Sequence, residues 1–177
     1  MKRIMAMKRL FFVIAVACMA LATAQAQKFA LVDMEYILKN IPAYERANEQ
    51  LNQQSKRWQG EIDEIVLEAE AMYKKYQSES AFLSDEQRTK REDEILAKEK
   101  EASELKRHYF GPQGEFYKKR ESLMAPIQDE IYTAVKEVSD AKGFSVVVDR
   151  ASAASIIYAS PKIDISNEVL VKLGYAN

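Results

Sequence analysis

Apolar residues recur every seven positions through the middle of the chain, between residues 43 and 77, where proline is absent. One line is made of Tyr44, Leu51, Trp58, Ile65 and Met72. A second line, three or four positions away, is made of Ile62, Ala69 and Tyr76. Most of the remaining positions are charged or carry amides. This heptad pattern predicts a helix of about 50 Å that packs along its length on another helix.

A second heptad line follows a short segment without periodicity, residues 78–84, which we interpret as the tip of a hairpin. Ser84 and Gln87 have the spacing of a capping box, which predicts the start of the next helix. Its seven-residue line consists of Ile95, Ala102, Tyr109, Phe116 and Leu123. Folding the chain back at residues 78–83 would place Trp58 opposite Ala102 and Leu105. An antiparallel coiled-coil helical hairpin over residues 42–142 is therefore expected.

Glycine and proline interrupt the second line at residues 110–114. Proline inside a helix removes one backbone hydrogen bond and clashes with the preceding turn. The seven-residue line resumes in phase after this place, so we expect a kink rather than the end of the helix. Gly111, Pro112 and Gly114 are the candidate hinge. The apolar pattern then continues past Pro126 and stops at Gly143, as is typical of a glycine after a helix end.

The two ends of the chain have a different pattern and predict a small β body. Short apolar strands are expected at residues 28–33, 145–149 and 156–158. Asp33 is expected to cap a short helix over residues 34–40, and Ser166 one over residues 167–173. The predicted fold is thus mainly α with a small β body (α+β). The body combines residues 27–41 with residues 143–177, and the hairpin projects from it as an arm.

So small a body is marginally stable by itself, because its core is too limited. Several of its strands are apolar on both faces, which predicts burial between subunits and obligate oligomerisation with cyclic symmetry. The candidate core of this interface consists of Phe29, Leu31, Val146, Val148 and Ile156.

The first 26 residues have the three parts of a secretory signal peptide. Four basic residues precede an apolar run over residues 10–21, and Ala24 to Ala26 supply the small residues of a cleavage site. We expect cleavage after Ala26, with a cut after Ala24 as the alternative, and hence export to the periplasm. The apolar run is shorter than the roughly 20 residues of a membrane-spanning helix, and no later run approaches that length. No integral membrane segment is expected.

Loss of this leader leaves 22 basic against 27 acidic residues, a net charge of about −5, and removes Cys18, the one cysteine. A nucleic-acid-binding surface of clustered basic residues is not visible. His108 is the single histidine, so no metal site or cofactor site is expected. Neither a phosphate-binding loop nor a hydrolase motif is present. The sequence therefore predicts no catalytic site, and we do not expect an enzyme.

Large apolar residues beside the heptad lines are more numerous than one helix seam requires. They either widen the seam and cap the tip, or they contact an apolar client, since exposed apolar patches usually mark interaction surfaces. The candidate client-contacting residues are Leu67, Tyr73, Phe82, Leu83, Leu96, Phe110 and Tyr117.

The order of these segments resembles the Skp/OmpH family of periplasmic chaperones over nearly the whole chain after the leader. The similarity is strongest in the segments IQDEIYTAVKEV (127–138), KGFSVVVD (142–149) and KIDISNEVL (162–170), and FALVD (29–33) resembles the first strand of the family. The resemblance implies a homotrimer in which three arms enclose a cavity. It also implies that this cavity receives unfolded outer-membrane β-barrel proteins and prevents their aggregation without ATP.

The charge of this chain departs from that family, whose better-known members are strongly basic. Arg88, Lys90 and Arg91 near the predicted tip lie among five acidic residues. Lipopolysaccharide binding is for this reason not carried over from the family. The alternative to a chaperone is a scaffolding coiled-coil protein of the cell envelope, whose arms would close on each other without a cavity.

Overall fold

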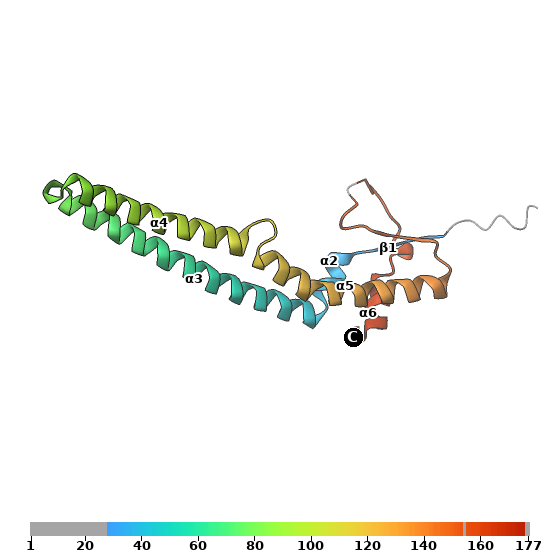
Figure 1. Ribbon diagram of the computed structural model, residues 1–177. Coiled ribbons are helices and arrows are strands. Elements are labelled where there is room, and N and C mark those ends of the chain that lie inside the picture. The colour runs from blue at the N-terminus through green and yellow to red at the C-terminus, as the bar shows by residue number, and fades with distance from the viewer. Residues whose placement is uncertain (1–27, 154, 176–177) are drawn as a thin grey trace, which may run out of the picture.

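The computed structural model describes residues 28–153 and 155–175, and the predicted signal peptide lies outside these described residues. A long helical hairpin projects from a small body in which the two ends of the described chain meet (Figure 1). This arrangement confirms the predicted fold class, mainly helical with a small β body.

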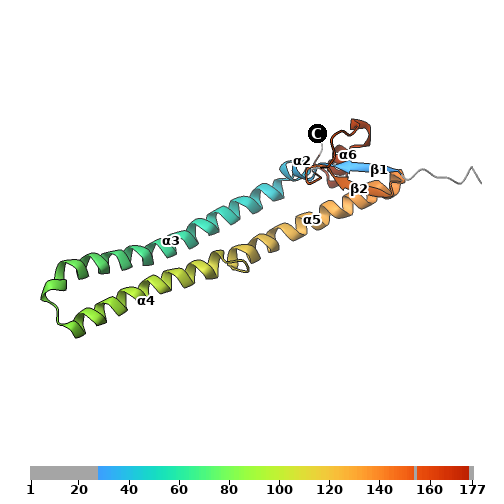
Figure 2. The same cartoon turned by 90° about the horizontal axis from the view of Figure 1, so that it is seen from above.

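The body is organised around two short strands, β1 (Phe29–Val32) and β2 (Val146–Asp149). They pair in parallel, with Phe29 opposite Val146 and Val32 opposite Asp149, and lie side by side in Figure 2. Parallel neighbours cannot be joined by a tight turn and need a crossover connection. In this chain the crossover is the whole arm, so pairing of the strands brings both ends of the hairpin to the body.

The core of the body lies between one face of the strands and three helices. These are α2 (Met34–Lys39), α6 (Ser166–Leu173) and the C-terminal half of α5 (Glu115–Lys142). Ala30 and Val32 point into this core, where Ile37, Ile131 and Val169 are almost fully buried. The core thus includes α5 residues that lie within the predicted arm. The proposed boundary between arm and body near residue 142 stays a prediction.

The predicted third strand, Ile156 to Tyr158, is wrong. Among the described residues they have no strand partner, and Ile157 is fully exposed. The backbone that pairs weakly with β1 is instead Asp164, opposite Leu31. An apolar tripeptide satisfies the composition of a strand, but strand formation depends on a neighbouring backbone that the sequence pattern does not reveal.

Ser166 is not the cap of α6, although the extent of that helix was predicted well. The Ser166 hydroxyl accepts a hydrogen bond from the backbone N–H of Asp33 at 2.8 Å and donates to Asp164 Oδ1 at 2.6 Å. Asp164 Oδ1 also accepts from the Ser166 backbone N–H at 2.9 Å. The residue at the N-cap position is Ile165. The Ser166 hydroxyl, which the sequence predicted to cap α6, therefore binds the backbone that follows β1 instead.

The arm is formed by α3 (Pro42–Glu79), the short 3-10 helix η1 (Ser80–Phe82) and α4 (Asp85–Phe110). Pro42 occupies the first turn of α3. The capping box is present, since the Ser84 hydroxyl accepts from the Gln87 backbone N–H and the Gln87 side chain accepts from the Ser84 backbone N–H. The buried seam follows the heptad lines through Leu51, Trp58, Ile62, Ala69, Ile95 and Ala102.

The pairing of α3 with α4 differs from the predicted register. Trp58 stacks on Tyr109, with ring centroids 5.1 Å apart, whereas the predicted register placed Trp58 opposite Ala102 and Leu105. Glu68 forms an ion pair with Lys98 at 3.0 Å, which fits the same shifted register. The shift arises because α3 continues to Glu79 and η1 adds another turn before α4 begins. The centre of the hairpin therefore lies a few residues later than the pattern placed it.

The expected kink is a complete interruption of the helix. Helix α4 ends at Phe110, and α5 begins at Glu115 after an intervening loop over residues 111–114. The second helix of the arm is consequently two helices. After this loop α5 continues through Pro126 and ends at Gly143, which has the left-handed φ of 70° that suits glycine.

Candidate functional surfaces

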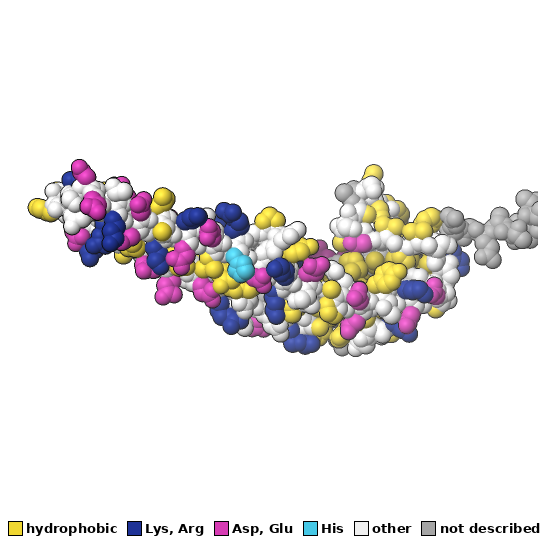
Figure 3. All heavy atoms as spheres, in the orientation of Figure 1, with side chains coloured by type: hydrophobic (Ala, Val, Ile, Leu, Met, Phe, Trp, Pro, Cys, Tyr) yellow, Lys and Arg dark blue, Asp and Glu magenta, His cyan; other side chains and the backbone are white. Residues whose placement is uncertain are grey.

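Five of the candidate client-contacting residues are strongly exposed on the arm. Phe82 at the tip is 89% exposed, Leu67 and Leu96 are each 63% exposed, and about half of each Tyr73 and Tyr117 side chain faces solvent. These residues lie off the heptad seam, so the pairing of α3 with α4 and α5 does not cover them. Figure 3 shows yellow apolar side chains scattered along the arm between charged groups. The arm thus carries apolar surface along its length and at its tip.

The other two candidate client-contacting residues are placed differently. Leu83 is half-buried where η1 ends. Phe110 packs inside the arm, with its ring edge on Trp58 at a centroid distance of 6.2 Å and a tilted contact with Phe116 at 5.9 Å. Phe110 is therefore part of the internal packing around the helix interruption, unlike the five residues above.

An aromatic cluster of Trp58, Tyr109, Phe110 and Phe116 bridges the interruption. Edge-to-face and stacked aromatic pairs stabilise packing beyond the burial of area alone. The Tyr109 hydroxyl also donates a hydrogen bond to the Glu61 carboxylate, which raises the pKa of Tyr109. This cluster packs α3 against both α4 and α5. The loop between α4 and α5 therefore lies beside a well-packed part of the arm.

The candidate hinge residues form the loop between α4 and α5, and two of them are required to be small. A Cβ on Gly111 would lie 2.3 Å from the Arg107 carbonyl oxygen, and one on Gly114 would lie 2.6 Å from the Tyr109 carbonyl oxygen. Neither glycine has a positive φ, so close approach of the backbone explains them. Pro112 is exposed within the same loop. Whether the loop acts as a hinge stays a prediction.

The candidate trimer-core residues lie mostly on the outer face of the strands. Phe29 is 52% exposed and Val146 is 43% exposed, while Val148 is half-buried. Leu31, which also alternates with the inward-facing Ala30 and Val32, is covered by its own chain and is 6% exposed. Ile156 is half-buried in the segment after β2. The exposed part of the predicted interface is thus a strip along β1 and β2.

The three most exposed large apolar residues of the described body were absent from the predicted surfaces. Ile157 is 100% exposed, Tyr158 is 82% exposed, and Tyr132 on α5 is 70% exposed. The signal for the first two was the apolar run at residues 156–158, which pattern analysis assigned to a strand. The sequence pattern does not indicate that Tyr132 is exposed, because an aromatic residue beside a helix seam is normally part of the core.

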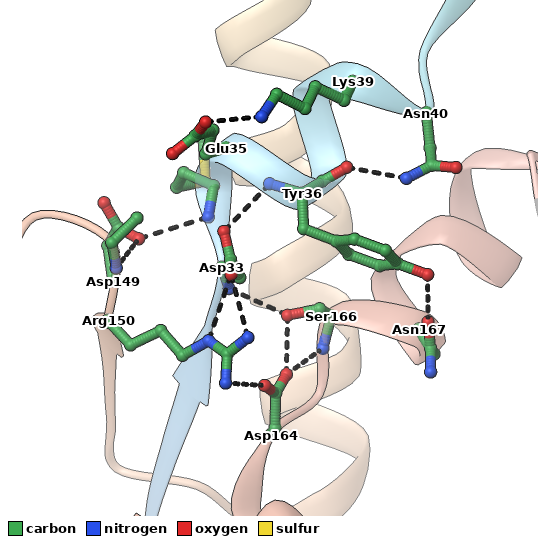
Figure 4. A network of polar contacts seen from close by, with 12 residues as sticks. Asp33, Glu35, Tyr36, Lys39, Asn40, Asp149, Arg150, Asp164, Ser166 and Asn167 are labelled. Atoms are coloured by element: carbon green, nitrogen blue, oxygen red, sulfur yellow. Dashed lines mark hydrogen bonds and ion pairs between the residues drawn. The ribbon is translucent and has the colours of Figure 1, made fainter.

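A polar network joins the body segments at the start of α2 (Figure 4). Asp33 Oδ1 accepts the Tyr36 backbone N–H at 2.8 Å, and Asp33 Oδ2 pairs with Arg150 Nη2 at 2.9 Å. Arg150 also reaches Asp164 Oδ2 at 3.4 Å. The Tyr36 N–H and the Arg150 guanidinium hold the pKa of Asp33 below its ordinary value. All members have structural partners, so the network fastens β1, α2 and α6 to the chain that follows β2.

The groove beside the helix interruption is polar and open. It is lined by Arg107, His108, Glu115 and Lys118, together with the loop itself. Lys118 pairs with Glu115 at 3.0 Å and holds the pKa of that carboxyl below its ordinary value. His108 is exposed. Within residues 28–153 and 155–175, side chains do not gather into a set that would hold a metal ion.

Helices of the described segments are too polar or too short in their apolar runs to cross a membrane.

Comparisons with known proteins agree with this architecture. The chain is 29% identical to the chaperone protein Skp of Yersinia enterocolitica over 156 residues, covering 87% of this chain and 90% of the relative. It is 28% identical to the chaperone protein Skp of Photorhabdus laumondii, covering 82% and 84% of the two chains. Both relatives are named as chaperones, and neither name refers to an enzyme.

The fold matches a crystal structure from Caulobacter crescentus that is described as an OmpH-like outer membrane chaperone. The TM-score is 0.66 at 14% identity, and the match covers 84% of each chain. The family model for outer membrane protein (OmpH-like) matches residues 28–173, which include all helices and strands described above. The chain therefore belongs to the OmpH-like family.

Proposed function

We propose that this protein is an ATP-independent holdase chaperone of the periplasm, which binds unfolded outer-membrane β-barrel proteins and prevents their aggregation. The observation that carries the proposal is the set of exposed apolar side chains along the arm, Leu67, Tyr73, Leu96 and Tyr117, with Phe82 at the tip. An unfolded apolar client can bury these surfaces without forming a specific folded interface. The names of the relatives as chaperones support the same function.

The working form is a homotrimer that assembles through the body. The strip of Phe29, Val146 and Val148 on the strands would be buried between copies, together with Ile156. Assembly would bury this apolar surface and so enlarge the core, which is small in a single copy of the body. Three arms would then project on one side and surround the client, with the loop at Gly111, Pro112 and Gly114 as the hinge that lets the arms spread.

Capture would rest on reversible apolar contacts, because the exposed candidate residues of the arm are large apolar side chains. Some charged groups of the arm are already paired with each other, as in the ion pairs Lys98–Glu68 and Lys118–Glu115. Surface ion pairs of this kind contribute little energy, so we expect client binding to be only weakly sensitive to salt.

The test is the aggregation of an outer-membrane β-barrel protein diluted from urea, followed by light scattering, with the protein added at one assembly per client. We expect aggregation to be suppressed equally with and without ATP. Unhindered aggregation would oppose the proposal.

Mass measurement and small-angle scattering of the same sample separate the holdase from the scaffolding alternative. A hollow trimer with spread arms is expected. A particle whose arms are closed on each other, and which leaves client aggregation unchanged, would favour a scaffolding coiled coil.

A further inference from the structure

The body exposes an apolar projection that its own chain does not cover. It consists of Ile157, which is 100% exposed, and Tyr158, which is 82% exposed, and it follows the half-buried Ile156. Full exposure means that Ile157 packs on nothing in its own chain. Burial of a large aliphatic or aromatic side chain is favourable, and this projection does not obtain that gain within its own chain.

The same body contains an apolar groove that its own chain does not fill. It lies between β1, β2 and α5 and has a volume of about 380 Å³. Its apolar lining comes from Val32, Met34, Ile131, Tyr132, Val135 and Val147. Figure 3 shows apolar side chains gathered in a hollow of the body, with the chain segment that contains the projection rising beyond it. We refer to this feature as the α5 groove.

The chemistry of the projection matches that of the groove. Ile157 is wholly apolar, whereas Tyr158 has an apolar ring and a hydroxyl at its tip. The α5 groove has an apolar floor, and Gln128, Lys136 and Asp149 supply polar groups at its margin. A buried tyrosine needs a hydrogen-bond partner for its hydroxyl, and these side chains could provide one. The volume suits one or two large side chains rather than a whole strand.

We propose that Ile157 and Tyr158 of one copy dock in the α5 groove of the next copy. Each chain carries one projection and one groove, so contacts of this kind join copies head to tail and close a ring in which every groove is filled. A client of variable sequence could not provide this one-to-one match. The inference rests on the proposed assembly through the body and adds to it a contact outside the strand strip of Phe29 and Val146.

The test is cross-linking between introduced cysteines in a chain that carries Cys18→Ala. Chains with Ile157→Cys and chains with Tyr132→Cys are unfolded in urea, mixed, refolded together and treated with a short dimaleimide. Tyr132 lines the groove and is 70% exposed, so its replacement should be tolerated. The control mixture replaces Tyr132→Cys by Leu67→Cys, because Leu67 is similarly exposed but lies on the arm. Any covalent pair in these mixtures joins two copies.

Cross-linked pairs are expected with Tyr132→Cys and not with Leu67→Cys. When Ile157→Cys and Tyr132→Cys are combined in one chain, the ladder should extend to the full assembly. Cross-links confined to one chain, or their absence in a sample whose mass shows an assembly, would overturn the docking contact and leave the proposed function standing. Failure to suppress client aggregation, by contrast, would remove the proposed function whatever the cross-linking shows.

A second measurement does not depend on cysteine placement. The double substitution Ile157→Ser and Tyr158→Ser changes exposed residues and should leave the helical content unchanged. It should raise the concentration at which the assembly dissociates by about tenfold or more, the effect of losing a central interface anchor. An unchanged dissociation concentration would count against the inference.

Discussion

Gly60 lies on the exposed side of α3 and has no neighbouring heavy atom within 4 Å of the position that a Cβ would take. Its φ is not positive, so neither close packing nor a special backbone conformation requires glycine here. Glycine within a helix costs conformational entropy relative to alanine. This residue therefore weakens the arm at its middle, in contrast to Gly111 and Gly114, which the backbone of the loop requires.

Gly60→Ala should stabilise the protein by about 0.5–1 kcal/mol, because alanine loses less entropy in a helix. The measurement is urea unfolding followed by circular dichroism at a fixed protein concentration, since assembly makes the midpoint depend on concentration. Ala71→Gly, at another exposed position of α3, is the matched control and should lower the midpoint by a similar amount. A lower midpoint for Gly60→Ala would contradict the expectation.

Asp33 makes the body sensitive to acid. Its pKa in the folded protein lies below the ordinary value of 3.8, because the Tyr36 backbone N–H and Arg150 favour the carboxylate. A depressed carboxyl pKa contributes stability that is fully present above the ordinary value and is lost as the pH falls through the folded pKa. The ion pair with Arg150 is therefore expected to weaken only as the pH falls below the ordinary pKa of 3.8.

Asp33→Asn should make the urea midpoint less dependent on pH between about pH 5 and pH 2, since asparagine still accepts the Tyr36 N–H but does not titrate. At neutral pH the variant should be less stable than the parent, because Arg150 loses one of its two charged partners. Glu99→Gln, an exposed position of the arm, serves as the control. Equal pH dependence of Asp33→Asn and the parent would show that Asp33 is not a source of acid sensitivity.

At the scale of elements, the loop between α4 and α5 decides the geometry of the arm. The loop replaces what the heptad pattern indicated as continuous helix, and it is fixed beside the cluster of Trp58 and Phe110. Its glycines approach backbone atoms that cannot move away as the end of a flexible side chain could. The interruption is consequently a defined structure, with a steric requirement at two positions.

Gly114→Ala should destabilise the protein by about 1–3 kcal/mol, the usual effect of forcing an added group into a packed site. The new Cβ would lie 2.6 Å from the Tyr109 carbonyl oxygen and 2.7 Å from that of His108. Gln113→Ala, at an exposed position of the same loop, should have little effect. Urea unfolding measures both variants, and equal stability of the two would argue against this steric explanation.

At the scale of the whole molecule, the body and the arm expose separate apolar surfaces, for which we propose different partners. Those of the body, Phe29, Val146 and the apolar projection, are proposed to meet other copies of the chain. Those of the arm, such as Leu67 and Leu96, are proposed to meet clients. Substitutions in the two regions should therefore separate assembly from client binding.

The double substitution Leu67→Ser and Leu96→Ser should weaken binding of an unfolded client about tenfold or more, because each leucine gives up roughly 1.5–3 kcal/mol of possible burial. The mass of the assembly should not change. Val171→Ser is the matched control, since Val171 is also 63% exposed but lies on α6 in the body. Titration of a fluorescently labelled client measures the affinity. Unaltered affinity in the double variant would place the client surface elsewhere.

The sequence by itself determined the elements whose causes are local. The capping box at Ser84, Pro42 at the start of α3 and the glycines after α5 and α6 each act within one helical turn, so neighbouring residues suffice to predict them. The heptad lines identified the buried seam for the same reason, because helix periodicity alone decides which residues share a face. Most of the fold and the exposed candidates of the arm followed from these signals.

Only the tertiary structure decided the features that depend on distant backbone. The partner of Trp58 was set by the length of the tip, where one added turn shifts every contact between α3 and α4. The Ser166 hydroxyl binds the backbone N–H of Asp33, more than a hundred residues away, instead of capping α6. Ile157 was left exposed since no strand lies beside it. Such choices follow from the free energy of long-range pairing, which local periodicity does not contain.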